Sequence, residues 1–122
     1  MKKIQIITLL AMISLTAMAQ KPKVYVTREI TPQSLVRIYK ALGRRAEGKV
    51  AVKISTGEAG NPNYLKPELI APLVQLVDGT IVECNTASGG QRSSTEDHMR
   101  AAAEPGFTAI APVDIMDAEG EI

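Results

Sequence analysis

At 122 residues, the chain is long enough for one hydrophobic core and too short for two full domains. Its 14 Lys and Arg residues nearly balance 13 Asp and Glu residues, and the formal net charge of +1 gives no basic surface of the kind that a nucleic-acid partner needs. A single cysteine excludes an internal disulfide, a cysteine-rich zinc site and an iron–sulfur cluster held by this chain alone.

The first residues have the three parts of a secretory signal peptide. Lys2 and Lys3 give a positive start, a mainly apolar stretch continues to Leu15, and Ala17 and Ala19 are the small residues that a signal peptidase recognises. The apolar stretch is shorter than the roughly 20 residues of a membrane span, so cleavage is favoured over an uncleaved anchor.

We therefore expect residues 1–19 to be removed and residues 20–122 to act in the periplasm or outside the cell, with no stable membrane anchor. The residue directly after Ala19 is not Cys, which excludes a lipoprotein, and no arginine pair precedes the apolar stretch, which excludes twin-arginine export. Loss of the two signal lysines lowers the formal net charge to about −1, which again argues against nucleic acid.

The first strand and helix are predicted near the start of the remaining chain. Lys23–Thr27 is rich in β-branched and aromatic residues, which favours a strand. Thr31 and Pro32 are typical of an N-cap and a first helical position, and Gly43 suits the end of that helix.

A second strand and helix follow the same plan. Val50–Ser55 is predicted as a strand, residues 56–64 as a loop and Pro67–Val77 as a helix by its apolar spacing. Pro72 should kink or split this helix, because it cannot donate the helical hydrogen bond.

The third unit begins with a strand at Thr80–Asn85 and a polar, glycine-rich loop at Thr86–Arg92. A helix is predicted from Ser94 or Thr95 to about Glu104, where Pro105 and Gly106 follow. The apolar run Phe107–Val113 is predicted as a fourth strand.

Alternating strands and helices predict a single α/β domain over residues 20–122 with a mainly parallel sheet. The strands are nearly continuous apolar runs, so we expect helices on both faces of the sheet. No helix is predicted after the fourth strand. We therefore expect the domain to be incomplete at its C-terminus, as the first part of a longer one; the alternative is a small complete domain with an unstructured tail.

Two loops at the carboxyl ends of the predicted strands have the composition of a ligand site, and ligands of open parallel sheets bind at this edge. Both combine glycines with hydroxyl and amide side chains, and the second leads into a helix N-terminus, where unpaired N–H groups attract phosphate or carboxylate. Neither loop fits a P-loop or a dinucleotide-binding motif, and turn formation alone also explains their composition. The candidate ligand-binding residues of these loops are Ser55, Thr56, Gly57, Glu58, Asn61, Asn85, Thr86, Gly89, Gly90 and Arg92.

Lys53 and Glu83 each lie near the end of an apolar strand that should be buried. A lone buried charge costs several kcal/mol, so we expect either that the two pair across neighbouring strands or that they line the ligand cleft. Asp114, just after the predicted fourth strand, is expected to approach the same cleft.

The remaining chemistry-bearing side chains favour no metal site and no recognisable catalytic group. Cys84 is expected to be buried and inert, as unpaired cysteines commonly are. His98 has no second His or Cys at ligand spacing and is expected on a helix surface or as a cap. No nucleophile motif or Ser-His-Asp order is present, so whether the protein is an enzyme, and its catalytic residues, stay open.

Three segments together resemble a known family. They are Val50–Glu58 with Gly60-Asn61-Pro62, Gly79–Thr86 with Gly89, Gly90 and Arg92, and Gly106–Asp114. They are similar to the N-terminal half of the domain of unknown function 362 family, over about Lys23 to Ile122. The resemblance implies a link to longer members that continue into a ferredoxin-like module binding 4Fe–4S clusters; this chain lacks those cysteines.

These observations give three hypotheses. The first is an exported α/β domain that binds a small anionic ligand between the two loops, with Lys53 and Glu83 behind them. The second is the N-terminal part of an iron–sulfur redox protein, which requires a cysteine cluster downstream of Ile122. The third is a truncated, inactive product. The ligand and the oligomeric state are not readable from the sequence.

Overall fold

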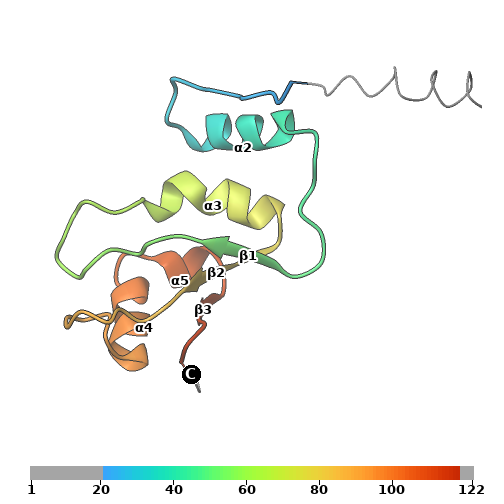
Figure 1. Ribbon diagram of the computed structural model, residues 1–122. Coiled ribbons are helices and arrows are strands. Elements are labelled where there is room, and N and C mark those ends of the chain that lie inside the picture. Colours follow the sequence, from blue (N-terminus) through green and yellow to red (C-terminus); the bar gives the residue numbers. More distant parts are fainter. Residues whose placement is uncertain (1–20, 119–122) are drawn as a thin grey trace, which may run out of the picture.

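The computed structural model describes residues 21–118, and the signal peptide predicted for residues 1–19 lies outside them. The helices and strands are α2 (Pro32–Ala41), β1 (Val50–Lys53), α3 (Pro67–Leu76), β2 (Gly79–Glu83), α4 (Thr95–Ala103), α5 (Phe107–Ile110) and β3 (Val113–Ile115). The strands form a parallel sheet in the order β1-β2-β3 (Figure 1). The predicted α/β class with a parallel sheet is therefore confirmed.

The hydrophobic core lies between the sheet and the helices that connect its strands. Ile70 and Val74 of α3, Ile81 of β2 and Phe107 of α5 form one cluster, in which each side chain is at most 4% exposed. α2 contacts α3, α3 contacts α5, and α5 contacts α4. The helices thus follow one another across the sheet in the same order as the strands β1, β2 and β3 (Figure 1).

Only one face of the sheet is covered by helices in the described part of the chain. The register aligns Val52 with Ile81 and Ile81 with Val113, and these three side chains pack in the core. The alternate residues Ala51 and Asp114 point the other way and are exposed. The prediction of two covered faces is wrong, because right-handed crossovers that all advance in one direction place their helices on one face.

The helix predicted after Thr31 is confirmed as α2, with its local capping chemistry. The Thr31 hydroxyl accepts a hydrogen bond from Ser34 N–H, and the Ser34 hydroxyl accepts one from Thr31 N–H, both at 3.1 Å. Two backbone donors at the helix start are thus satisfied reciprocally. Gly43 follows the helix with a φ of +65°, a conformation that glycine adopts without strain.

The other two predicted helices are also confirmed. Pro72 lies inside α3 without splitting it, and the helix ends at Leu76. In α4, the Ser94 hydroxyl accepts a hydrogen bond from Asp97 N–H as the N-cap. The strands β1 and β2 each end two residues earlier than predicted, because the chain turns at Ile54 and Cys84 to begin the carboxyl-edge loops.

Two predicted strands are wrong. Lys23–Thr27 is exposed and outside the sheet, because no strand of the sheet bonds to it. In the run Phe107–Val113, residues Phe107–Ile110 form the short helix α5 and only Val113 begins β3. Gly106, with a φ of +100°, ends the preceding turn and directs Phe107 into the core, so burial rather than strand formation explains this apolar run.

Candidate functional site

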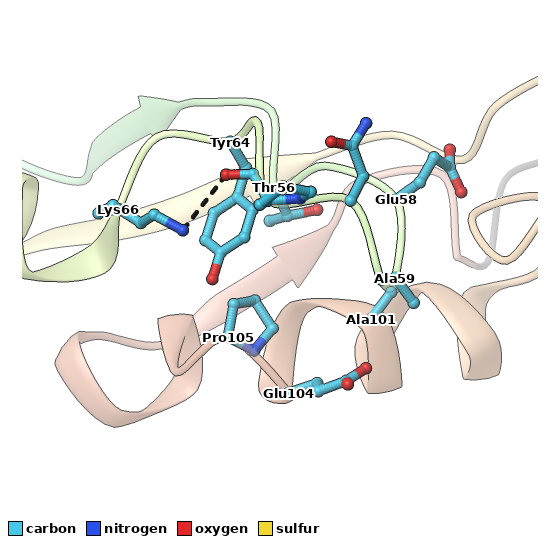
Figure 2. Close-up of a pocket in the computed structure, with 11 residues that line it drawn as sticks. Thr56, Glu58, Ala59, Tyr64, Lys66, Ala101, Glu104 and Pro105 are labelled. Carbon is cyan, nitrogen blue, oxygen red and sulfur yellow. Dashed lines mark hydrogen bonds between the residues drawn. The ribbon is translucent and has the colours of Figure 1, made fainter.

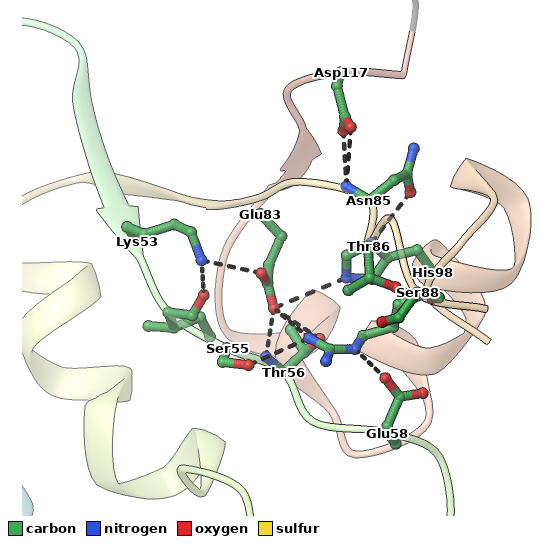
Figure 3. Close-up of polar contacts among 12 residues, drawn as sticks. Lys53, Ser55, Thr56, Glu58, Glu83, Asn85, Thr86, Ser88, His98 and Asp117 are labelled. Atoms are coloured by element: carbon green, nitrogen blue, oxygen red, sulfur yellow. Dashed lines mark hydrogen bonds and ion pairs between the residues drawn. The ribbon is translucent and has the colours of Figure 1, made fainter. Parts of the chain in front are cut away.

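The carboxylate of Glu83 is the centre of a buried polar cluster at the carboxyl end of the sheet (Figure 3). Its Oε1 accepts hydrogen bonds from the Thr56 N–H at 2.6 Å and the Thr56 hydroxyl at 3.1 Å, and its Oε2 accepts one from Lys53 Nζ at 3.1 Å. Burial works to raise the pKa of Glu83, but these hydrogen bonds outweigh it and hold the pKa below the ordinary 4.5. Glu83 is therefore ionised at neutral pH.

The predicted pairing of Lys53 with Glu83 is found, but only one partner is buried. The side chain of Lys53 is 56% exposed, whereas that of Glu83 is 4% exposed. Lys53 ends the edge strand β1, in which Ala51 and Lys53 are exposed and Val50 and Val52 are half-buried. It reaches Glu83 from this exposed position. The ammonium group thus stays in contact with solvent while it neutralises a buried carboxylate.

His98 is fully buried, so its prediction as a surface or capping residue is wrong. It shares the inner face of α4 with Ala101 and Ala102, whose small side chains leave room for the imidazole ring. Its Nδ1 lies 3.3 Å from Asn85 Oδ1, while its Nε2 lies 3.8 Å from Glu83 Oε1 and has no hydrogen-bond partner among residues 21–118. Burial lowers the pKa of His98 below 6.5, against the attraction of Glu83, so the ring is neutral at pH 7.

Arg92 joins the two candidate loops. Its Nε donates to Glu58 Oε1 at 2.7 Å, and its terminal Nη1 lies 3.3 Å from Ser55 Oγ and 3.7 Å from Glu83 Oε1. The arginine side chain is only 16% exposed. Its guanidinium group therefore already faces two protein carboxylates, and the loops touch each other where a cleft was predicted.

The second loop is closed by backbone hydrogen bonds. Thr86 N–H donates to the Arg92 carbonyl at 2.8 Å, and Asn85 N–H donates to the Asp117 carboxylate at 2.9 Å. The N-terminus of α4 carries two acidic side chains of its own, Glu96 and Asp97, in its first turn. These carboxylates occupy the positive end of the helix that was predicted to attract an anionic ligand.

A pocket of about 290 Å³ lies on the outer side of the first loop, against the C-terminal end of α4 (Figure 2). The ammonium group of Lys66 stands 3.8 Å from the centre of the Tyr64 ring and donates to the Pro62 carbonyl at 3.3 Å. No carboxylate of residues 21–118 lies within ion-pair distance of this ammonium group. The floor includes Thr56, and the opposite wall includes Glu104.

The structure separates the predicted site residues into groups. Thr56, Glu58 and Asn61 line the pocket. Asp114 does not approach it, because the side chain points to the uncovered face of the sheet, beside Thr80 and a groove around Lys49. The other predicted residues lie beside the pocket, in the Glu83 cluster or in the second loop, and do not line it: Lys53, Ser55, Gly57, Glu83, Asn85, Thr86, Gly89, Gly90 and Arg92.

Several residues of the pocket were not singled out in the sequence. Tyr64 is the last residue of the first loop and Lys66 follows it, whereas Ala101, Glu104 and Pro105 lie at or just after the end of α4, far along the chain. The one available signal was a lysine directly before the Pro67 that begins a helix, and this arrangement predicts no ligand by itself.

The side chains do not fit the iron–sulfur cluster of the longer proteins that the sequence resembles. Within residues 21–118, no group of three or more His, Cys, Asp and Glu side chains could hold a metal ion. Cys84 is exposed, so the prediction of a buried thiol is wrong; it comes directly after β2, where the chain leaves the sheet. None of the helices in the described residues is long and apolar enough to cross a membrane.

No protein-family model, curated protein or solved structure matches the chain. The family resemblance therefore stays a prediction from the sequence.

Proposed function

We propose that the chain is an exported α/β domain that binds a small anionic molecule in the pocket between the first loop and the end of α4. The observation that carries the proposal is the ammonium group of Lys66, which lines this pocket without a carboxylate partner among the described residues. Arg92 and Lys53, the other cations of this edge, are each paired with a carboxylate.

The pocket is small, and its size limits the ligand. A volume of about 290 Å³ is just below the usual range for small-molecule sites, roughly 300–1,000 Å³. The ring of Tyr64 supplies an apolar wall and Asn61 a side-chain amide, whereas the N–H and hydroxyl of Thr56 already donate to Glu83. A carboxylate or phosphate bound at Lys66 would thus have the neutral amide of Asn61 beside it and the carboxylate of Glu104 on the opposite side.

The test is the melting temperature of purified residues 20–122 in phosphate and in malonate, against chloride at the same ionic strength. We expect a saturable rise in one of the two anions, since a ligand at 100 times its Kd stabilises the folded state by about 2.7 kcal/mol. Lys66→Met should abolish the rise, and Lys49→Met, which removes a lysine at the opposite end of β1, should preserve it. The same rise in both variants, or no saturable rise in either anion, would contradict the proposal.

Export is tested separately, by the intact mass of the protein in the cell envelope and the medium. A mass that begins at Gln20 is expected. An uncleaved N-terminus in the cytosolic fraction would refute export without affecting the ligand site.

A further inference from the structure

The segment Lys23–Thr27 has the sequence of a strand and lies outside the sheet. Val24 and Val26 are 85% and 82% exposed, which is unusual for two valines in an extended chain. The segment runs along α2 (Figure 1), and its residues Lys23, Val24 and Tyr25 border one groove with side chains of α2 and with Leu73 of α3. Its backbone is connected to α2 through only Arg28, Glu29 and Ile30 before the N-cap.

The outer edge of β1 has no strand partner in the described residues. β1 stands at the end of the sheet and pairs only with β2. Its free N–H and C=O groups would accept another strand, and such edges are usually covered or blunted in natural proteins. An added strand of five residues would match the four residues of β1.

The position of α2 indicates which strand belongs at this edge. α2 packs beside α3, the helix that connects β1 to β2. A right-handed crossover into β1 from a strand on its outer side would place its helix beside α3, on the same face of the sheet. α2 already occupies this place, and the segment before it runs opposite to α2 (Figure 1), which is the direction of a strand parallel to β1.

The segment only partly covers the apolar side of α2 where it now lies. A groove of about 490 Å³ is lined by Leu35, Ile38 and Leu42 of α2, by Leu73 of α3, and by Lys23, Val24 and Tyr25 of the segment itself. Leu42 is 55% exposed. Apolar side chains from a strand beneath α2 would cover this surface, and Val24 and Val26, two residues apart, would project to the same side.

We propose that Lys23–Thr27 docks on the free edge of β1 as a fourth parallel strand, with Val24 and Val26 packed against the groove of α2. The hinge is at Arg28. Glu29 stays fixed to the start of α2, because its carbonyl accepts a hydrogen bond from Ser34 Oγ at 2.6 Å. The ion pair of Glu29 with Arg37 is about two-thirds exposed at both ends, so it does not hold the segment in its undocked position.

Docking would also extend the carboxyl edge of the sheet. Thr27 would end level with the end of β1, so that Arg28 would lie beside the first loop near Ser55. This arrangement follows from the topology of the sheet and does not depend on the proposed ligand.

Hydrogen–deuterium exchange of purified residues 20–122 tests the docking. If the segment is docked, the amides of residues 24–27 and of β1 should exchange at least about 100-fold more slowly than those of an unstructured peptide. The reason is that both segments would then be hydrogen-bonded as neighbouring strands of the sheet. Val26→Asp should abolish the protection of residues 24–27 and lower the melting temperature by about 4–8 °C. Ile30→Asp, the same change at a residue that is 85% exposed and outside the strand, should do neither.

Exchange of residues 24–27 at the unstructured rate would overturn the inference. Size-exclusion chromatography with light scattering, at two protein concentrations, shows whether the docked strand comes from the same chain or from a second copy. A monomer with protected residues 24–27 supports docking within one chain. A dimer whose dissociation removes the protection would overturn it in favour of exchange between two copies.

Discussion

At the scale of single residues, Glu83 ties the first loop to the sheet at its carboxyl edge. One carboxylate satisfies the buried N–H and hydroxyl of Thr56, accepts a hydrogen bond from Lys53 and lies near Arg92 and His98. The position of the first loop therefore depends on a charge in the second strand. The sequence predicted the Lys53 pair from two charges in apolar strands, but it held no sign that Thr56 or His98 would join them.

Removing the two partners of this ion pair should have very different costs. Glu83→Leu is expected to lower the free energy of unfolding by about 3 kcal/mol, because it leaves the Thr56 N–H buried without an acceptor. Lys53→Met should cost less than about 1 kcal/mol, since the lysine is more than half exposed. Urea denaturation of the two variants checks this asymmetry, and equal costs would show that Glu83 is not the anchor of the loop.

At the scale of elements, the helices were easier to predict than the strands at either end of the chain. Two helices begin at local capping signals. α2 begins after Thr31, with Pro32 as its first residue, and α4 begins after Ser94, with an acidic first turn. Lys23–Thr27 and Phe107–Ile110 lack such signals. Whether an apolar run pairs in a sheet or packs as a turn of helix depends on distant residues, here the core around Ile81.

The helix α3 tolerates Pro72 because the rest of its inner face is well packed. Ile70 and Val74 are 4% and 1% exposed, whereas Pro72 points to solvent. Pro72→Ala would restore the missing backbone donor and remove the clash with the preceding turn. We expect it to raise the free energy of unfolding by about 1–3 kcal/mol.

Thermal and urea unfolding of the Pro72→Ala protein measure this gain. Gln75→Ala, an exposed position of the same helix, is the matched control and should change stability by less than about 0.5 kcal/mol. A destabilised Pro72→Ala protein would mean that the proline ring makes contacts that outweigh its cost in the helix.

At the scale of the whole molecule, the two shifted pKa values act in the same direction on folding. His98 has a folded pKa below its unfolded 6.5, so the unfolded state binds its proton first as the pH falls. Glu83 has a folded pKa below 4.5, and again the unfolded state takes up the proton first. Both groups stabilise the fold fully at high pH and lose this contribution on acidification.

We therefore expect the free energy of unfolding to be constant above about pH 7.5 and to fall in two stages, the first below 6.5 and the second below 4.5. His98→Gln should remove the first stage and leave the second. Urea midpoints measured from pH 8 to pH 4 give the curve. A wild-type protein that gains stability between pH 6.5 and 5 would contradict the assignment of a buried neutral His98.

The order of the strands has a consequence for where a ligand can bind. In open α/β sheets, a crevice forms where the strand order reverses and neighbouring loops part to opposite faces. Here β1, β2 and β3 advance in one direction, so the loops after β1 and β2 turn to the same side and meet through Glu58 and Arg92. Within residues 21–118 the strand order does not reverse, so no gap opens between these two loops, and the pocket lies beside the first of them, against α4.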